Sequence, residues 1–270
     1  MSRLLIFGLG YTAVRIAARL RSAGWRVDAT GSAGNIVFED AGTVLAEATH
    51  VLSSVPPGGD VDPVLDRYGG ALGGKWLGYL SSTGVYGDAG GAWIDESAPL
   101  NGRRGGRITA ELAWQALGAR AFRLPGIYGP GRSALDRVLE GKAHRVDLPG
   151  QIFSRVHVDD IASGVIAGLG APPGVYNLAD DRPASQNTVI ETACALLGVA
   201  PPSFVALESL SVASRAFYGE NRRVANGKAK RLLGWRPAYP DFAAGLGALI
   251  PPASPASAST PPAAASSDQR

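Results

Sequence analysis

The chain has 270 residues, of which 46% are apolar, and its formal net charge is +3. This length and apolar content suit one large domain or two small ones with a substantial core, which excludes wholesale disorder. The single cysteine, Cys194, excludes an internal disulfide and a cysteine-based zinc site, and the three histidines lie far apart, so we expect no metal. Because the basic residues are scattered, we also expect no nucleic-acid partner.

The two ends of the sequence carry no targeting pattern. The first apolar run is broken by Gly8 and Gly10 and is followed by arginines, unlike a secretory signal peptide. No uncharged apolar stretch reaches the roughly 18 residues that a membrane span needs, so we expect no membrane partner and a cytoplasmic location. Residues 250–270 are rich in Pro, Ala and Ser, and we expect them to form a disordered tail.

Short apolar runs alternate with amphipathic stretches along the chain. Residues 3–7 predict a strand, 11–23 a helix that ends at Gly24, and 26–30 a second strand. Further strands are expected at 50–55, 76–81, 119–123 and 175–179, and helices at 109–117, 159–169 and 185–197. This alternation predicts an α/β fold in which helices cover both faces of a doubly wound parallel sheet.

One connection departs from this alternation. Only five residues, 31–35, separate the second strand from the next strand-like run, residues 36–39. A parallel crossover needs about ten or more residues. The run at 36–39 is therefore either not a parallel neighbour of the second strand, or irregular.

A glycine turn follows the first strand. Gly8-Leu9-Gly10-Tyr11-Thr12-Ala13 fits G-x-G-x-x-A and opens a predicted helix, which is the context of a dinucleotide-binding turn. In that motif the first glycine permits the tight turn, the second lets a pyrophosphate approach, and the small third residue allows helix and strand to pack closely. We therefore expect Gly8, Gly10, Tyr11, Thr12 and Ala13 to contact a nicotinamide dinucleotide.

The end of the second strand bears on the choice of cofactor. NAD sites usually place a carboxylate there, whereas NADP sites place a basic residue. The stretch 30–32 carries neither, and Asp28 lies too early in the strand. With Thr30 and Ser32 available as hydroxyl donors, NADP is the preferred cofactor and NAD the alternative.

A set of motifs begins with Leu80-Ser-Ser-Thr-Gly-Val-Tyr86-Gly87 and continues in the stretches 95–99, 123–132, 155–162, 176–183 and 230–237. In these motifs the chain resembles the extended short-chain dehydrogenase/reductase family, in its epimerase/dehydratase-like group, and the resemblance covers nearly everything before the tail. It implies an NAD(P)-binding Rossmann core of residues 1–130, with contributions from 155–180, and a substrate-binding lobe of 131–154 and 181–249.

The resemblance also implies site residues. Catalysis in this family uses a Ser/Thr and a Y-x-x-x-K pair. Ser82 and Thr83 match the first position, but the sequence holds no Y-x-x-x-K, and Arg103 and Arg107 stand where its Tyr and Lys are expected. The chain thus resembles an atypical subgroup. Arg107 could bind the cofactor ribose, Val55 and Pro125 are further expected cofactor contacts, and Tyr86 is either a replacement proton carrier or a packing residue.

The substrate side carries several arginines. In sugar-nucleotide members of the family an arginine lies four residues before the His of H-V-x-D, whereas this chain has Phe153 there. Arg132, Arg155 and Arg222 could instead bind a carboxylate or a phosphate. The sequence therefore predicts an NAD(P)-dependent oxidoreductase or epimerase/dehydratase-like enzyme that acts on a small polar substrate, which could be an anion. The alternative is a non-catalytic dinucleotide-binding protein, and in either case a homodimer is conceivable.

Overall fold

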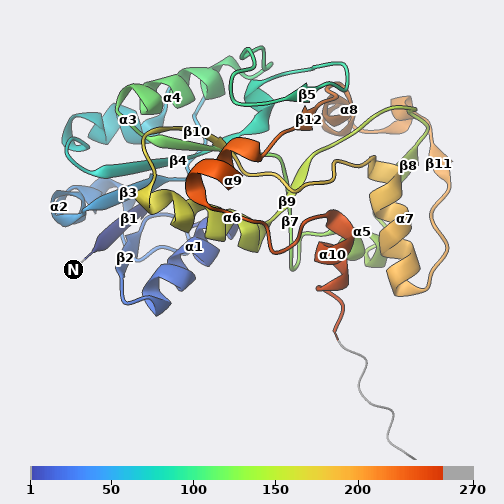
Figure 1. Cartoon of the computed structure of the whole chain (residues 1–270), viewed down its shortest axis with the longest axis horizontal. Coiled ribbons are helices and arrows are strands. Elements are labelled where there is room, and N and C mark those ends of the chain that lie inside the picture. The colour runs from blue at the N-terminus through green and yellow to red at the C-terminus, as the bar shows by residue number, and fades with distance from the viewer. Residues whose placement is uncertain (1, 252–270) are drawn as a thin grey trace, which may run out of the picture.

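The computed structural model describes residues 2–251, so residues 252–270 of the expected tail lie outside the described part of the chain. Within residues 2–251, six parallel strands form the central sheet in the order β10-β6-β4-β3-β1-β2 (Figure 1). Their bounds are β1 Arg3–Phe7, β2 Arg26–Ala29, β3 His50–Ser53, β4 Trp76–Ser82, β6 Arg120–Leu124 and β10 Gly174–Asn177. The predicted α/β fold with a doubly wound parallel sheet is confirmed.

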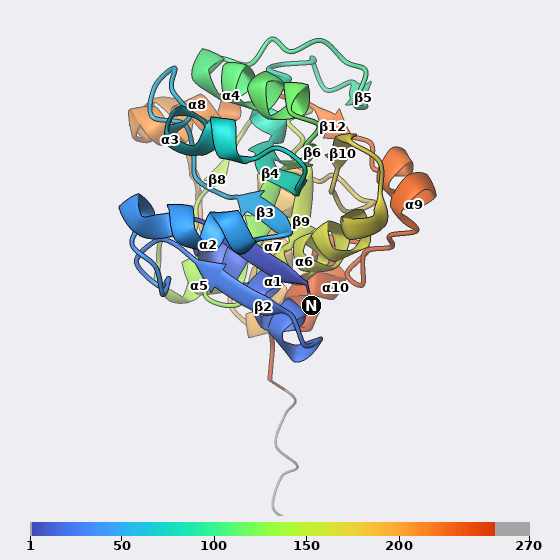
Figure 2. The same ribbon diagram turned by 90° about the vertical axis from the view of Figure 1, so that its left-hand side faces the viewer.

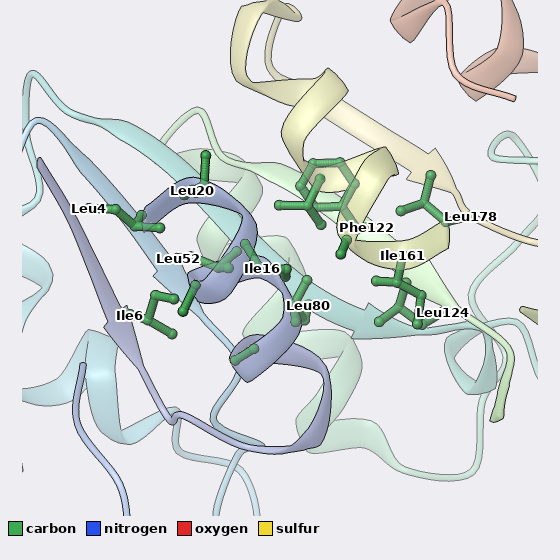
Figure 3. Packing of buried hydrophobic residues seen from close by; sticks show 14 of the residues in the cluster. Leu4, Ile6, Ile16, Leu20, Leu52, Leu80, Phe122, Leu124, Ile161 and Leu178 are labelled. Atoms are coloured by element: carbon green, nitrogen blue, oxygen red, sulfur yellow. The ribbon is translucent and has the colours of Figure 1, made fainter. Parts of the chain in front are cut away.

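Helices cover both faces of the sheet (Figure 2). α1 (Tyr11–Ser22), α6 (Val158–Ala167) and α9 (Gly227–Leu233) lie on one face, and α2 (Ala41–Glu47), α3 (Pro63–Tyr68) and α4 (Gly105–Ala116) lie on the other. Alternate residues of β1 serve the two faces, because Leu4 packs with the first helix group and Leu5 with the second. Figure 3 shows the first face, where Ile16 of α1 and Ile161 of α6 pack over the strands.

The connection that the sequence left open runs from β2 to β3. The run at residues 36–39 is irregular, because Ile36 makes a lone parallel bridge to Thr30 and the chain then enters a 3₁₀ turn at Phe38–Asp40. α2 carries the chain across to β3, which pairs with the opposite side of β1. The direction of winding therefore reverses at β1, and in open α/β sheets ligands bind at the carboxyl ends of strands beside such a point.

A smaller lobe packs beside the carboxyl end of the sheet (Figure 1). Its apolar cluster comes from α5 (Ala134–Leu139), α7 (Gln186–Leu197) and α10 (Phe242–Gly247). The remaining strands pair in twos: β7 (Gly126–Tyr128) with β9 (Arg155–His157), β8 (Arg145–Val146) with β11 (Phe204–Val205), and β5 (Trp93–Ile94) with β12 (Arg223–Val224); α8 (Val212–Tyr218) precedes β12. α9, within the segment expected to belong to the lobe, packs on the sheet core.

None of the helices within residues 2–251 is long and apolar enough to cross a lipid bilayer.

An ion pair is buried where α4 meets the sheet. The guanidinium of Arg123, near the end of β6, donates from Nε and Nη2 to the carboxylate of Glu111 on α4, with Nη2 2.6 Å from Oε1. Ser81 of β4 donates its hydroxyl to the same carboxylate. Glu111 is fully buried and Arg123 is 2% exposed. One carboxylate therefore ties α4 to the carboxyl ends of two neighbouring strands.

We predict that Glu111→Gln destabilises the protein by about 3–5 kcal/mol, because the Arg123 charge then stays buried without a counterion. The matched control is Glu140→Gln, which breaks the exposed pair with Lys142 and costs less than about 1 kcal/mol. Denaturant unfolding of both variants measures the difference. Equal free energies of unfolding for the two variants would contradict the stated role of the buried pair.

Candidate functional site

The turn between β1 and α1 is shaped as the sequence predicts. Gly8 has φ +87°, a conformation that side-chain-bearing residues rarely adopt. Its N–H donates to the hydroxyl of Thr30 at 3.1 Å, and the N–H of Leu9 donates to the carbonyl of Thr30 at 2.7 Å. Among residues 2–251, no side chain caps the start of α1 at Gly10. The first N–H groups of α1 therefore remain available to an anion.

The fold of the protein does not itself require a glycine at position 10. Its φ is −91°, and a Cβ built there would meet no atom of the described residues within 4 Å. An alanine would therefore fit the folded chain. The space in front of Gly10 is what a pyrophosphate needs in order to approach the backbone, so the open cradle fits a dinucleotide. Ala13, fully buried, packs the start of α1 onto the sheet core.

The end of β2 separates the two hydroxyls predicted to reach the cofactor. Thr30 is 2% exposed and its Oγ1 already accepts from Gly8, whereas Ser32 is exposed and makes no side-chain hydrogen bond within residues 2–251. Asp28 is bound by Arg3 and Asn35, as expected for a carboxylate placed too early for a ribose. A hollow of about 460 Å³ beyond this point is lined by Gly31, Gly34, Asn35, Ile36, Val37 and Phe38.

A cavity of about 490 Å³ lies between the carboxyl end of the sheet and the smaller lobe. It brings together six of the residues predicted from the sequence, namely Ser82, Thr83, Arg107, Pro125, Arg155 and Arg222. Ser82 accepts the N–H of Gly84 at 3.1 Å, which leaves its own proton free to donate. The hydroxyl of Thr83 makes no side-chain hydrogen bond within the described range. Two hydroxyl-bearing residues thus line the cavity, Ser82 half-buried and Thr83 4% exposed.

Tyr86 does not line this cavity. It is 3% exposed, its hydroxyl donates to Oδ1 of Asn177 at 2.8 Å, and the guanidinium of Arg123 lies over its ring at 4.5 Å from the centroid. Burial raises the pKa of Tyr86 to about 12. The geometry therefore favours the packing role over the proton carrier, and side-chain direction of this kind cannot be read from the sequence.

Several arginines around the cavity are already committed to protein partners. Arg103 donates to Glu220 at 2.8 Å and to the carbonyl of Ala216, and Arg222 donates to the other oxygen of Glu220 at 2.5 Å. Arg155 is 8% exposed and donates to two carbonyls and to Gln186. Burial lowers the pKa of Arg155 to about 10, so its charge persists at neutral pH.

Two arginines at the start of α4 remain available. Arg104 and Arg107 line the cavity, and within residues 2–251 neither guanidinium makes a hydrogen bond or an ion pair. Sequence reasoning assigned no ligand contact to Arg104, although the cluster of arginines at 103–107 was the signal for it. The first turn of α4 is closely held, because a Cβ on Gly106 would lie only 1.7 Å from the carbonyl oxygen of Gly59.

Arg132 lies apart from the first cavity. Its guanidinium is 5.6 Å from the ring centroid of Tyr11, whose hydroxyl donates to the carbonyl of Pro130. Arg132 lines a second cavity of about 610 Å³, which shares Gly126, Arg155 and Phe217 with the first. The three predicted substrate arginines therefore divide between two adjoining cavities. Val55 lies at the base of the glycine turn, 3.0 Å from a Cβ built on Gly8.

Comparison with known proteins supplies a family. No protein-family model matches the chain. A conserved protein of unknown function from Silicibacter pomeroyi is 38% identical, covering 92% of this chain and 98% of that one, with a TM-score of 0.83. The chain belongs to the same family as that protein. It is also 30% identical to the Escherichia coli protein YeeZ over 177 residues, 60% of this chain and 58% of YeeZ.

More distant matches support the fold. A 3-diazoavenalumate denitrifying reductase from Streptomyces is 30% identical over 52% of this chain and 51% of the reductase. The chain thus spans little more than half the length of the curated relatives it matches. Two structures covering 92% of this chain are dTDP-glucose 4,6-dehydratase of Bacillus anthracis with NAD (18% identical, 94% of that chain, TM-score 0.72) and human epimerase family protein SDR39U1 with NADPH (17%, 98%, 0.70). The predicted epimerase/dehydratase-like fold is confirmed.

Tyr86→Phe tests where the Tyr86 hydroxyl lies. Because burial raises its pKa from 10.0 to about 12, the native protein and the variant should show equal phenolate absorbance at pH 10. In denaturant at the same pH the two should differ by about half a tyrosine, which is the internal control. Because burial favours the neutral phenol, the folded state carries stability below pH 10 that is lost as the pH rises through 12. Removal of the hydroxyl leaves Oδ1 of Asn177 without its donor and costs about 1–3 kcal/mol. A native difference of half a tyrosine at pH 10 would contradict this burial.

Proposed function

We propose that the protein is an NAD(P)-dependent oxidoreductase or epimerase/dehydratase-like enzyme acting on a small polar substrate. The observation that carries the proposal is that a pyrophosphate cradle at Gly10 and a cavity bearing Ser82 and Thr83 open at the carboxyl ends of the same sheet. Strand ends at one edge of a parallel sheet bring a cofactor and a substrate together. A dinucleotide that extends from the turn along this edge would reach the two hydroxyls.

The residues present fit such a cofactor. The N–H groups at the start of α1 and the backbone of Gly10 would hold the pyrophosphate, and the apolar hollow at residues 31–38 would receive the adenine. Ser32 stands at the adenosine ribose position. Because residues 30–32 hold no carboxylate to reject a 2′-phosphate, we favour NADP(H) over NAD(H). Arg107 would replace the family lysine at the second ribose.

In this proposal the side chains of the cavity polarise the reacting oxygen of the substrate and do not act as general acid or base. The nicotinamide, when bound, supplies or accepts a hydride. Ser82 and Thr83 can donate hydrogen bonds to the reacting oxygen, and Arg107 can stabilise negative charge that develops there. A guanidinium does not release its proton near neutral pH, and Tyr86 is buried away from the cavity, so the proton would come from water.

A non-catalytic dinucleotide-binding protein is the second candidate. The specific observation that favours it is the position of Tyr86, which leaves the cavity without a tyrosine among its described lining residues. Binding of NADPH without transfer of label from the nicotinamide to any of a panel of carbonyl compounds would support this candidate. Transfer to one of them would support the enzyme.

Gly10→Ala tests the cofactor claim. A Cβ at position 10 fits the fold but occupies the pyrophosphate space, so we predict an unchanged melting temperature without ligand and at least a ten-fold weaker affinity for NADPH. The matched control is Gly73→Ala, because a Cβ there also meets nothing within 4 Å but lies far from the turn along the chain.

The measurement is the rise in melting temperature with NADPH and with NADH up to millimolar concentration. The wild type and Gly73→Ala should be stabilised, and more strongly by NADPH than by NADH. If neither cofactor stabilises the wild type, the proposed function is wrong. If Gly10→Ala binds as well as the wild type, the site has been placed wrongly.

A further inference from the structure

The walls of the first cavity carry an unbalanced charge. Its lining includes five arginines, at positions 103, 104, 107, 155 and 222, and the acidic side chain among its described lining residues is Glu220. Glu220 is bound by Arg103 and Arg222 together. One carboxylate cannot neutralise this set, so the cavity favours a negatively charged occupant.

The positive charge that is free to bind such an occupant lies at the start of α4. Arg104 is the N-cap residue just before α4, and Arg107 lies three residues further on, in the first turn of that helix. Both line the cavity, and within residues 2–251 both guanidinium groups lack a protein partner. Two guanidinium groups at one cavity offer donors that a carboxylate or a phosphate group accepts.

The cavity also has an aromatic wall. Phe153 and Phe217 both line it, and their rings are stacked with centroids 4.1 Å apart and planes at 14°. Phe217 remains 49% exposed despite this stacking, and the half-buried Ile152 adds further apolar surface. An exposed aromatic side chain at a cavity wall gains most from a planar apolar group stacked on it.

From these observations we infer that the substrate is an amphipathic organic anion, a carboxylate or phosphate monoester joined to a planar apolar group. This inference rests on the proposed function, because the same cavity holds Ser82 and Thr83. Arg104 binds the anionic group beside Arg107, which the proposed function assigns to the second ribose of the cofactor, and Phe217 contacts the planar part. Arg155 and Arg222, which the sequence suggested for this task, instead hold the lobe and the backbone in place through their protein partners.

The test uses simple probes with the full chain saturated with NADPH. Ligand-observed NMR titration compares benzoate and phenyl phosphate with benzamide, which lacks the charge, and with acetate, which lacks the ring. We expect benzoate or phenyl phosphate to bind at least ten-fold more tightly than both benzamide and acetate. The stronger of the two anions identifies the anionic group. Benzamide binding as tightly as the anions, or acetate as tightly as benzoate, overturns the inference.

Two variants locate the anion site. Arg104→Gln should weaken binding of the preferred anion at least ten-fold while NADPH affinity changes less than two-fold. Arg236→Gln is the matched control, because Arg236 is exposed, lines neither cavity and has no hydrogen bond within the described residues. Equal anion binding by wild type and Arg104→Gln overturns the assignment.

The two proposals fail separately. The anion titration is repeated without NADPH, so that selective anion binding can be measured even if the cofactor does not bind. Failure of both NADPH and NADH to bind contradicts the proposed function alone. Bound NADPH with no preference for an anion contradicts only the inference about the substrate.

Discussion

The buried carboxylate of Glu111 is the constraint on which the candidate site depends. It accepts hydrogen bonds from Nε and Nη2 of Arg123 of β6, from Ser81 of β4 and from Gln115 of α4 itself, and it is fully buried. Moving α4 relative to the sheet would leave a charge unpaired in the protein interior, which is costly. The start of α4, with Arg104 and Arg107, is therefore held in register with Ser82 and Thr83, which directly follow Ser81. A single ion pair thus fixes the hydroxyl wall of the cavity against its cationic wall.

The arginines at the start of α4 change what the site can do. In the short-chain dehydrogenase/reductase family that the sequence resembles, a proton-carrying tyrosine and a lysine are expected there, whereas a guanidinium keeps its proton and offers charge and hydrogen bonds. The site is thereby suited to hold an anion and to stabilise developing negative charge. Arg103 also joins the sheet core to the lobe by its hydrogen bonds to Glu220 and Ala216 of the segment 212–220.

The first half of the fold followed from local patterns. The order of β1, α1 and β2 could be predicted from the spacing of apolar residues along the chain. The turn at Gly8 could be predicted because glycine adopts backbone angles that other residues rarely do. The sequence also indicated that residues 36–39 depart from the strand–helix alternation, because too few residues separate them from β2 for a parallel crossover. Its path through a 3₁₀ turn depends on packing of Phe38 against Phe7 and Tyr68, which are distant in sequence.

The site was predictable in its location but not in its side-chain partners. Ser82, Thr83, Arg107 and Pro125 meet because they follow strands or begin a helix at one edge of the sheet. Whether an arginine is free depends on long-range contacts such as Arg222 with Gly87 and Glu220, which no local pattern shows. Tyr86 turns toward Asn177, 91 positions away, for the same reason.

A crystal structure of the protein grown with NADPH tests the account most directly. The account predicts a pyrophosphate bound to the N–H groups at the start of α1 beside Gly10, and a nicotinamide that faces Ser82 at the edge of the arginine-lined cavity. A dinucleotide bound elsewhere on the chain, or a nicotinamide turned away from Ser82, would contradict it.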